Sequence, residues 1–383
     1  MKHFSRLISA LLSVTIISFS HAEIPVARTD GQTTASLQGA EDISALLAPI
    51  RKKAGAPALG VLYMEGDVVK AIGVDGVRSN LSDAAVTLDD QWHLGSDTKA
   101  MTATMLAKLI DDGQLRWEQT IGETFPEWDG KIDAAYETAT LEQLLHHCGG
   151  VQAAVVSDEA WVALFNSKEP MPQQRETLAI HMLSLKPVDA PGKKYNYSNE
   201  GYMIAAMMAE KKTGKSYETL MQEIIFDPLG MKSAGWGIPG TIGKTNQPWG
   251  HRMAFGVLNA VQFDNPLTIA AAGCAHMSLR DWAKFAALSM KGARGESTFL
   301  KKETFERLQK PMLDDYACGW MVADRPWAKG KTLSHGGSNS MWYCVIWIAP
   351  KTNRAYLAVA NSGGDAAASA CDEAVTAMIS KYK

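Results

Sequence analysis

The chain has 383 residues, of which 46% are hydrophobic, and its formal net charge at pH 7 is −3. This length suits one large domain or two closely packed ones, with enough apolar residues for a substantial core. The slight negative charge argues against nucleic acid or an anionic membrane surface as a partner.

The first 22 residues differ in character from the rest. Lys2 and Arg6 precede an apolar run over 7–19, and Ser20-His21-Ala22 then places small residues at the two positions that a signal peptidase reads. The run is too short for a membrane span, and no later stretch is long enough to be one. We therefore expect residues 1–22 to be a signal peptide and the protein to be periplasmic or secreted, without a membrane span once the signal is removed.

Strand patterns occur at both ends of the remaining chain. Five runs have this character: 58–64, 68–74, 316–322, 341–348 and 355–360. The first two are joined by Glu65-Gly66-Asp67, which predicts a hairpin. Amphipathic helices are predicted before the first strand, over 42–53, and after the last one, over about 366–382.

Helix patterns dominate between residue 96 and about residue 290. Three residues precede apolar segments as N-caps do: Thr140, Ser216 and Ser278. Between 227 and 265 this pattern gives way to Gly, Pro, Trp and Asn, and so long a loop in a compact protein is more often functional than idle. We predict an α/β (α+β) fold, in which an antiparallel sheet from both chain ends (about 39–90 and 300–383) is flanked by helices and carries a mostly helical insertion (about 91–299).

Ser96 stands where a helix is predicted to begin, and Lys99 follows three residues later on the same helical face. Unpaired backbone N–H groups and the positive end of the helix dipole favour negative charge on the serine oxygen there. A lysine in that environment loses its proton more easily than a free one and can then accept the hydroxyl proton. Ser96 is therefore the candidate nucleophile, although Ser-x-x-Lys alone is weak and recurs at Ser380–Lys383.

Tyr197 and Asn199 can add to this pair. They stand two apart in a predicted extended loop, so both side chains can face one cleft. Beside Lys99 the phenolate of Tyr197 would be favoured, which makes Tyr197 a candidate general base. Asn199 can hydrogen-bond Lys99 and a substrate carbonyl. Taken alone, Tyr197 is more readily explained as a half-buried packing residue.

A third cluster is the run from His335 to Ser338, which contains Gly336 and Gly337 and leads into a predicted strand. The two glycines permit the close approach of a substrate backbone. The backbone N–H groups of Ser338 and Ser96 together would make an oxyanion hole. A glycine turn with a surface histidine remains an equal alternative for this run in isolation.

Cysteine and histidine usage points to no metal centre. The five cysteines are Cys148, Cys274, Cys318, Cys344 and Cys371. An odd number leaves at least one thiol free or bridged to another chain, and we expect mostly buried thiols with at most one or two disulfides. The adjacent His146 and His147, with the other histidines, lack the spacing of a zinc motif.

Taken together, Ser96-x-x-Lys99, Tyr197-x-Asn199 and His335-x-Gly337 resemble the three motifs of the serine β-lactamase and penicillin-recognising family. The chain is most similar to the class C-like branch, with its family VIII esterase and D-peptidase relatives. Further segments fit family patterns at 144–150, 227–231, 272–273, 280–281 and 316–320. The likeness covers nearly all of residues 23–383 and agrees with the predicted fold.

The resemblance implies a mechanism. Ser96 would be acylated while Lys99 and Tyr197 move its proton, and water would then release the acyl group with Tyr197 as base. Asn199, His335, Gly337 and Ser338 would contact the substrate, which would be a small ester, amide or D-peptide. The resemblance implies neither a metal nor an organic cofactor.

The third motif departs from that of class C β-lactamases, which carry a lysine where this chain has His335. A histidine is mostly neutral at pH 7, so it is a weaker anchor for a substrate carboxylate. Together with Thr98 before Lys99, this favours an esterase or a D-amino-acid amidase or peptidase. A true β-lactamase or DD-carboxypeptidase is the alternative within the family. A penicillin-binding sensor without turnover, or a silent scaffold, is the alternative outside catalysis.

Overall fold

The computed structural model describes residues 39–153 and 158–382. The predicted signal peptide over 1–22 lies outside the described residues. Within the part that is described, no helix is both long and apolar enough to cross a membrane.

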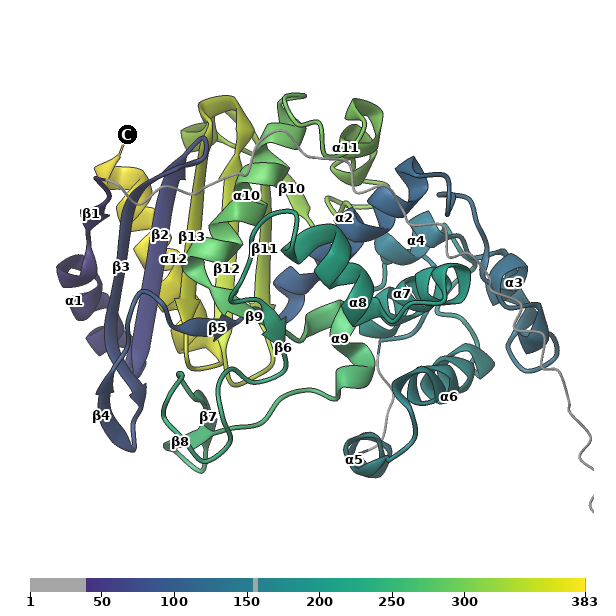
Figure 1. The fold of residues 1–383 in the computed structure, drawn as a ribbon, viewed down its shortest axis with the longest axis horizontal. Helices are drawn as coiled ribbons and strands as arrows, with labels where there is room; N and C mark the ends of the chain where they lie inside the picture. Colours follow the sequence, from purple (N-terminus) through teal and green to yellow (C-terminus); the bar gives the residue numbers. More distant parts are fainter. Residues whose placement is uncertain (1–38, 154–157, 383) are drawn as a thin grey trace, which may run out of the picture.

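The two ends of the chain build one eight-stranded sheet (Figure 1), in the order β1-β3-β2-β13-β12-β11-β10 with β4 paired to β3. The strands are β1 (Glu41–Asp42), β2 (Ala58–Glu65), β3 (Val68–Ser79), β4 (Ser82–Ala85), β10 (Met321–Arg325), β11 (Gly330–Ser338), β12 (Tyr343–Ala349) and β13 (Arg354–Ala360). All pairs are antiparallel except β1 with β3. β2 joins the two ends because it pairs with β13 in a register that places Leu62 opposite Leu357. The predicted fold class is confirmed.

Helices cover both faces of this sheet. On one face α1 (Ser44–Ala54) and α12 (Asp365–Lys381) enclose a small core that includes Leu47, Tyr63 and Met378. On the other face α10 (Leu279–Ala293) lies across the strands and buries Trp282 and Phe285 in the main core. The β2 residues alternate between the two cores, which explains why this strand reads as an unbroken apolar run.

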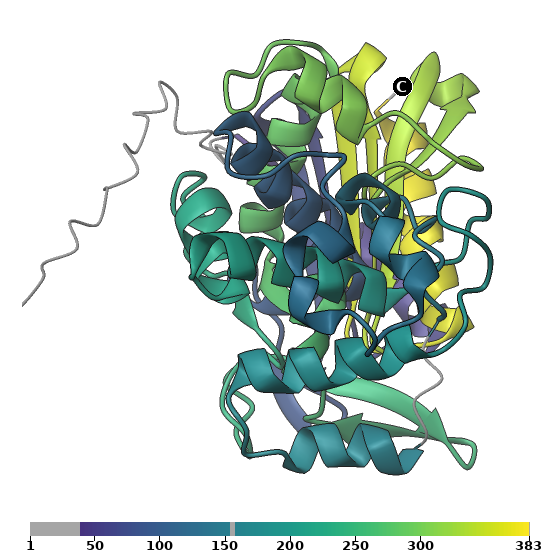
Figure 2. The same cartoon turned by 90° about the vertical axis from the view of Figure 1, so that its right-hand side faces the viewer.

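The middle of the chain forms a mostly helical part, seen in front of the sheet in Figure 2. Its helices are α2 (Thr98–Asp111), α3 (Ile121–Thr124), α4 (Leu141–Leu145), α5 (Asp158–Asn166), α6 (Met171–Ser184), α7 (Asn199–Thr213), α8 (Tyr217–Met221) and α9 (Ala270–Gly273), and α11 (Lys302–Leu308) follows α10. The side chains of Thr140, Ser216 and Ser278 each accept a backbone N–H three residues on, so the three predicted N-caps are confirmed.

Several local predictions were wrong. The strand predicted over 316–322 begins only at Met321, and His335–Ser338 belongs to strand β11, which excludes the alternative of a glycine turn with a surface histidine. The region 227–265 contains β6 (Gly235–Trp236) and the hairpin of β7 (Gly250–Ala254) and β8 (Val257–Val261). β6 joins β9 (Ala275–Ser278) and β5 (Gln91–His93) in a small sheet. The expectation for the cysteines, mostly buried thiols with at most one or two disulfides, is confirmed, because all five are buried free thiols.

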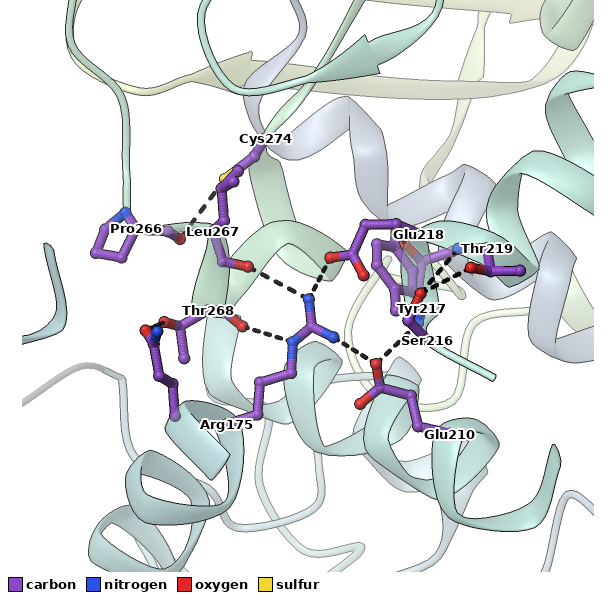
Figure 3. Close-up of polar contacts among 12 residues, drawn as sticks. Arg175, Glu210, Ser216, Tyr217, Glu218, Thr219, Pro266, Leu267, Thr268 and Cys274 are labelled. Atoms are coloured by element: carbon purple, nitrogen blue, oxygen red, sulfur yellow. Dashed lines mark hydrogen bonds and ion pairs between the residues drawn. The ribbon is translucent and has the colours of Figure 1, made fainter. Parts of the chain in front are cut away.

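A buried guanidinium fastens three helices to the segment that leads into α9 (Figure 3). Arg175 of α6 is only 1% exposed and forms ion pairs with Glu210 of α7 and Glu218 of α8. It also donates hydrogen bonds to the carbonyl oxygens of Leu267 and Thr268, at 3.4 and 3.3 Å. We call these five residues the Arg175 cluster. Because a buried charge is costly unless it is paired, the cluster fixes the position of residues 267–268 relative to the helices.

Candidate active site

Ser96 lies in a short 3-10 turn, η1 (Gly95–Asp97), between β5 and α2. Strand β11 passes directly beside this turn. A Cβ atom on Gly95, whose φ is +48°, would lie 2.3 Å from the backbone nitrogen of Ser338, and one on Gly337 would lie 2.0 Å from the Leu94 carbonyl oxygen. Only glycine permits such an approach at these two positions. The fold therefore places the backbone of Ser338 beside Ser96, as a shared oxyanion hole requires.

Lys99, in the first turn of α2, is completely buried. Its Nζ lies 3.2 Å from Ser96 Oγ, 2.8 Å from Asn199 Oδ1 and 2.7 Å from the Ala272 carbonyl oxygen. Burial lowers the pKa of Lys99 to about 7, although the nearby Glu200 acts in the opposite direction. A substantial fraction of Lys99 is therefore a neutral amine near pH 7, held where it can accept the Ser96 proton.

Tyr197 stands just before α7 and faces the same pair. Its hydroxyl is hydrogen-bonded to Ser96, and Lys99 Nζ lies 4.6 Å from the centre of its ring. Burial raises the pKa of Tyr197 far above its usual value, and the hydrogen bond from Ser96 only partly offsets this. The expectation that the phenolate would be favoured beside Lys99 was therefore wrong, because desolvation dominates the pKa of Tyr197. In the resting site Tyr197 is a neutral phenol.

His335 lies on β11 at the far side of the Ser96 turn, only 7% exposed. Its Nδ1 is 2.8 Å from the Gly336 carbonyl oxygen and its Nε2 is 3.3 Å from the Tyr316 hydroxyl. Burial, together with Lys99, lowers the pKa of His335 to about 3. The imidazole is neutral at pH 7, in the direction that the sequence indicated.

A second histidine, His147, lies at the centre of the site and was named in the sequence only beside His146. Its ring contacts four tyrosines at centroid distances of 4.2–6.0 Å: Tyr195, Tyr197, Tyr202 and Tyr316. Its Nδ1 accepts the backbone N–H of Ser198 at 3.1 Å, which places the proton on Nε2. His147 thus supports both the ring of Tyr197 and the loop that carries it. Its place in the 144–150 segment was the available signal.

Two buried carboxyl groups also flank Lys99 and were not predicted. Asp97, between Ser96 and Lys99, has one oxygen 2.8 Å from Cys344 Sγ and the other without a hydrogen-bond partner. Burial raises the pKa of Asp97 well above its usual range. Glu200 is fully buried beside Asn199, and burial raises its pKa as well. The signal in the sequence was the acidic residue Asp97 inside the Ser-x-x-Lys motif, directly after the candidate nucleophile.

A bracket of three polar side chains ties the region 227–265 to the site. Asp264 Oδ2 lies 2.8 Å from His93 Nε2, and Asp264 Oδ1 accepts a hydrogen bond from Asn339 Nδ2 at 2.8 Å. His93 Nδ1 in turn accepts the backbone N–H of Gly95 at 3.1 Å. The bracket therefore connects the Ser96 turn with the end of β11. Within the ranges 39–153 and 158–382, no three His, Cys, Asp or Glu side chains converge as a metal site would require.

Comparison with known proteins gives a consistent picture. A family model described as Beta-lactamase matches residues 43–377. Protein flp of Staphylococcus aureus (strain MW2) is 22% identical over 324 residues, which is 81% of this chain and 60% of that relative. Unguisins hydrolase ungD' of Aspergillus campestris (strain IBT 28561) is 25% identical over 286 residues, 69% of this chain and 51% of that relative. The chain thus spans between half and two thirds of the length of these relatives.

Among solved structures, a D-stereospecific amidohydrolase from Streptomyces sp. superposes with a TM-score of 0.67 at 21% identity. The superposition covers 86% of this chain and 97% of that one. At this identity the likeness demonstrates a shared fold, with the sheet and the helical part in the same arrangement.

Proposed function

Since this chain belongs to the beta-lactamase family, we propose that it is a serine hydrolase that works through an acyl-enzyme on Ser96. One observation carries the proposal: Lys99 Nζ lies 3.2 Å from Ser96 Oγ in a buried setting that lowers its pKa to about 7. A surface lysine at the same spacing would be protonated and could not accept the serine proton. The hydrolase relative among the comparisons supports the reaction class.

In acylation, the neutral amine of Lys99 takes the proton from Ser96 Oγ as the oxygen attacks the substrate carbonyl carbon. The backbone N–H groups of Ser96 and Ser338 stabilise the negative charge on the carbonyl oxygen. The bond to the leaving group then breaks, the leaving group takes the phenol proton of Tyr197, and the Lys99 ammonium returns a proton to Tyr197. The products of this half-reaction are the acylated serine and a free alcohol or amine.

In deacylation, a water molecule attacks the ester formed on Ser96. Because Tyr197 is a neutral phenol, it serves as a relay: its oxygen accepts the water proton while its own proton passes to Lys99. Asn199 holds Lys99 in place through its Oδ1. The tetrahedral intermediate collapses, Ser96 leaves with the proton from Lys99, and the carboxylic acid product is released.

The substrate class that we propose is a small ester or a D-amino-acid amide or peptide. The neutral, buried His335 stands where class C β-lactamases carry the lysine that holds a carboxylate, so an anionic substrate gains little there. The D-stereospecific amidohydrolase with the same fold favours the amide option. Turnover of β-lactams, as in a true β-lactamase or DD-carboxypeptidase, is the second candidate, because the acylation groups are all in place.

We also propose that the protein is exported, on the basis of residues 1–22.

The test is a panel of p-nitrophenyl acetate, D-alanine p-nitroanilide and a chromogenic cephalosporin, with the wild type, Ser96→Ala and Ser380→Ala. Ser380 is the matched control, because it belongs to the second Ser-x-x-Lys of the chain. We expect ester or anilide hydrolysis that disappears only in Ser96→Ala. Absence of Ser96-dependent turnover or acylation would refute the proposal of a serine hydrolase. Stable acylation by the cephalosporin without turnover would indicate a penicillin-binding sensor. Fast turnover of the cephalosporin without hydrolysis of the esters would favour a β-lactamase. N-terminal sequencing of the protein from the cell envelope, with a start at Glu23 expected, tests export.

A further inference from the structure

Two exposed phenylalanines from different segments of the chain pack against each other. Phe263 follows β8 and is 51% exposed, and Phe165 of α5 is 36% exposed. Their ring centres are 4.7 Å apart. Aromatic rings kept this open to water forgo the stabilisation that burial would give them. We call them the phenylalanine pair.

The position of Phe263 is set by its neighbour Asp264. The two carboxylate oxygens of Asp264 contact His93 and Asn339, each at 2.8 Å. His93 holds the backbone of Gly95, directly before Ser96, and Asn339 directly follows Ser338. The bracket therefore fixes the backbone directly after Phe263 between the Ser96 turn and the end of β11, the two segments whose N–H groups would bind the carbonyl oxygen of the substrate.

The same segment is also held at its other end. The Arg175 cluster binds the carbonyl oxygens of Leu267 and Thr268, which point toward the buried guanidinium in Figure 3. Residues 264–268 are thus anchored by the bracket on one side and by a buried ion-pair network on the other. An apolar surface fixed in this way loses little conformational entropy when it contacts a ligand.

We propose that the phenylalanine pair is a wall that receives an apolar acyl group of the substrate. This inference rests on the proposed function. The leaving group must lie toward Tyr197, from which it takes its proton, so the acyl part lies on the other side of the reacting carbonyl group, which we assign to the side of Phe263. The substrate class is therefore narrowed to esters or amides whose acyl part carries an aliphatic chain or a ring.

The expected size of the preference follows from burial. Full burial of a methylene group is worth roughly fourfold in affinity, and contact with a wall on one side about twofold. Acetyl and hexanoyl groups differ by four methylenes, so we expect kcat/KM for p-nitrophenyl hexanoate to exceed that for the acetate roughly sixteenfold.

The experiment measures this hexanoate-to-acetate ratio in the wild type, Phe263→Ser, Phe263→Leu and Phe255→Ser. Phe255 is the matched control, because it is a fully exposed phenylalanine at the tip of the β7–β8 hairpin. We expect the ratio to fall to within about twofold of unity in Phe263→Ser, to be largely kept in Phe263→Leu, and to be unchanged in Phe255→Ser. Thermal unfolding of each variant verifies that the fold is retained.

Three results would overturn the wall. They are a wild-type ratio near one despite Ser96-dependent turnover, an equal loss of preference in Phe255→Ser, and a preference that follows the length of the alcohol instead of the acyl chain. Each of them leaves the proposed function standing. If no ester or amide is turned over in a Ser96-dependent way, the proposed function itself fails, and the wall fails with it.

Discussion

Replacement of Lys99 by methionine should remove activity and, at the same time, change how stability depends on pH. The folded protein binds the Lys99 proton with a pKa of about 7, whereas the ordinary value is 10.5. Between these two values the unfolded state binds more protons than the folded state. The free energy of unfolding of the wild type should therefore rise with pH across this window, and this rise should be absent in Lys99→Met.

The magnitude can be worked out from the two pKa values. The lowered pKa of Lys99 destabilises the folded wild type by ~5 kcal/mol at pH 6 and by ~2 kcal/mol at pH 9, since one pKa unit corresponds to about 1.4 kcal/mol. The variant also leaves the Asn199 oxygen and the Ala272 carbonyl without this donor, at about 1–3 kcal/mol each. That loss does not depend on pH. The stability of the wild type relative to the variant should therefore improve by about 2 kcal/mol between pH 7 and pH 9.

Urea unfolding at pH 6, 7, 8 and 9 measures this difference. Lys108→Met is the control, because Lys108 lies on the same helix with its ammonium paired to Asp112 at the surface. The control should keep the wild-type slope. The same group should govern the rate, so kcat/KM should rise tenfold per pH unit below pH 7 and level off above it. Two results would refute the claim that Lys99 is a neutral amine near pH 7. One is the same pH dependence of the free energy of unfolding in the wild type and Lys99→Met, and the other is an activity that does not fall on acidification through pH 7.

Three further substitutions test other parts of the site. Tyr197→Phe should lower kcat by roughly 10²–10⁴ with little change in thermal stability, and near-normal turnover would remove Tyr197 from the proton relay. His335→Lys should raise kcat/KM for a carboxylate-bearing substrate over that for an uncharged ester by about tenfold, and an equal change for both would show that His335 does not face the anion. Arg175→Met should cost about 3–5 kcal/mol in chemical unfolding because Glu210 and Glu218 lose their buried partner, and a loss under 1 kcal/mol would contradict that role.

The parts of the fold that were predictable depend on local patterns. Alternating and continuous apolar runs located β2, β3, β12 and β13, and short polar residues at fixed offsets located the N-caps. Strand β11 escaped prediction because a Gly-Gly pair has little preference for strands. Its extended form is imposed by β10 and β12, which pair with it on either side.

Motif spacing located the site residues, but it did not predict their protonation states. The sequence brings Tyr197 near Lys99, but the burial that keeps Tyr197 protonated comes from residues far away in the chain, among them His147 and Tyr316, whose rings contact the ring of Tyr197. The bracket was equally invisible, since Asp264 and His93 are 171 positions apart. Such contacts follow from the packing of the sheet against the helical part and leave no periodic signal.

The pairing of β2 with β13 determines how late in synthesis the sheet of this protein can form. The central strands of the sheet come from residues near 60 and near 357, so the sheet cannot close until almost the whole chain has been synthesised. Contacts of such long sequence separation form late and slowly, and until then β2 presents an unpaired apolar edge. A nascent or truncated chain that ends before Arg354 therefore lacks the strand that closes the sheet. For the export that we propose, this late closure of the sheet would leave the chain unfolded while it crosses the membrane.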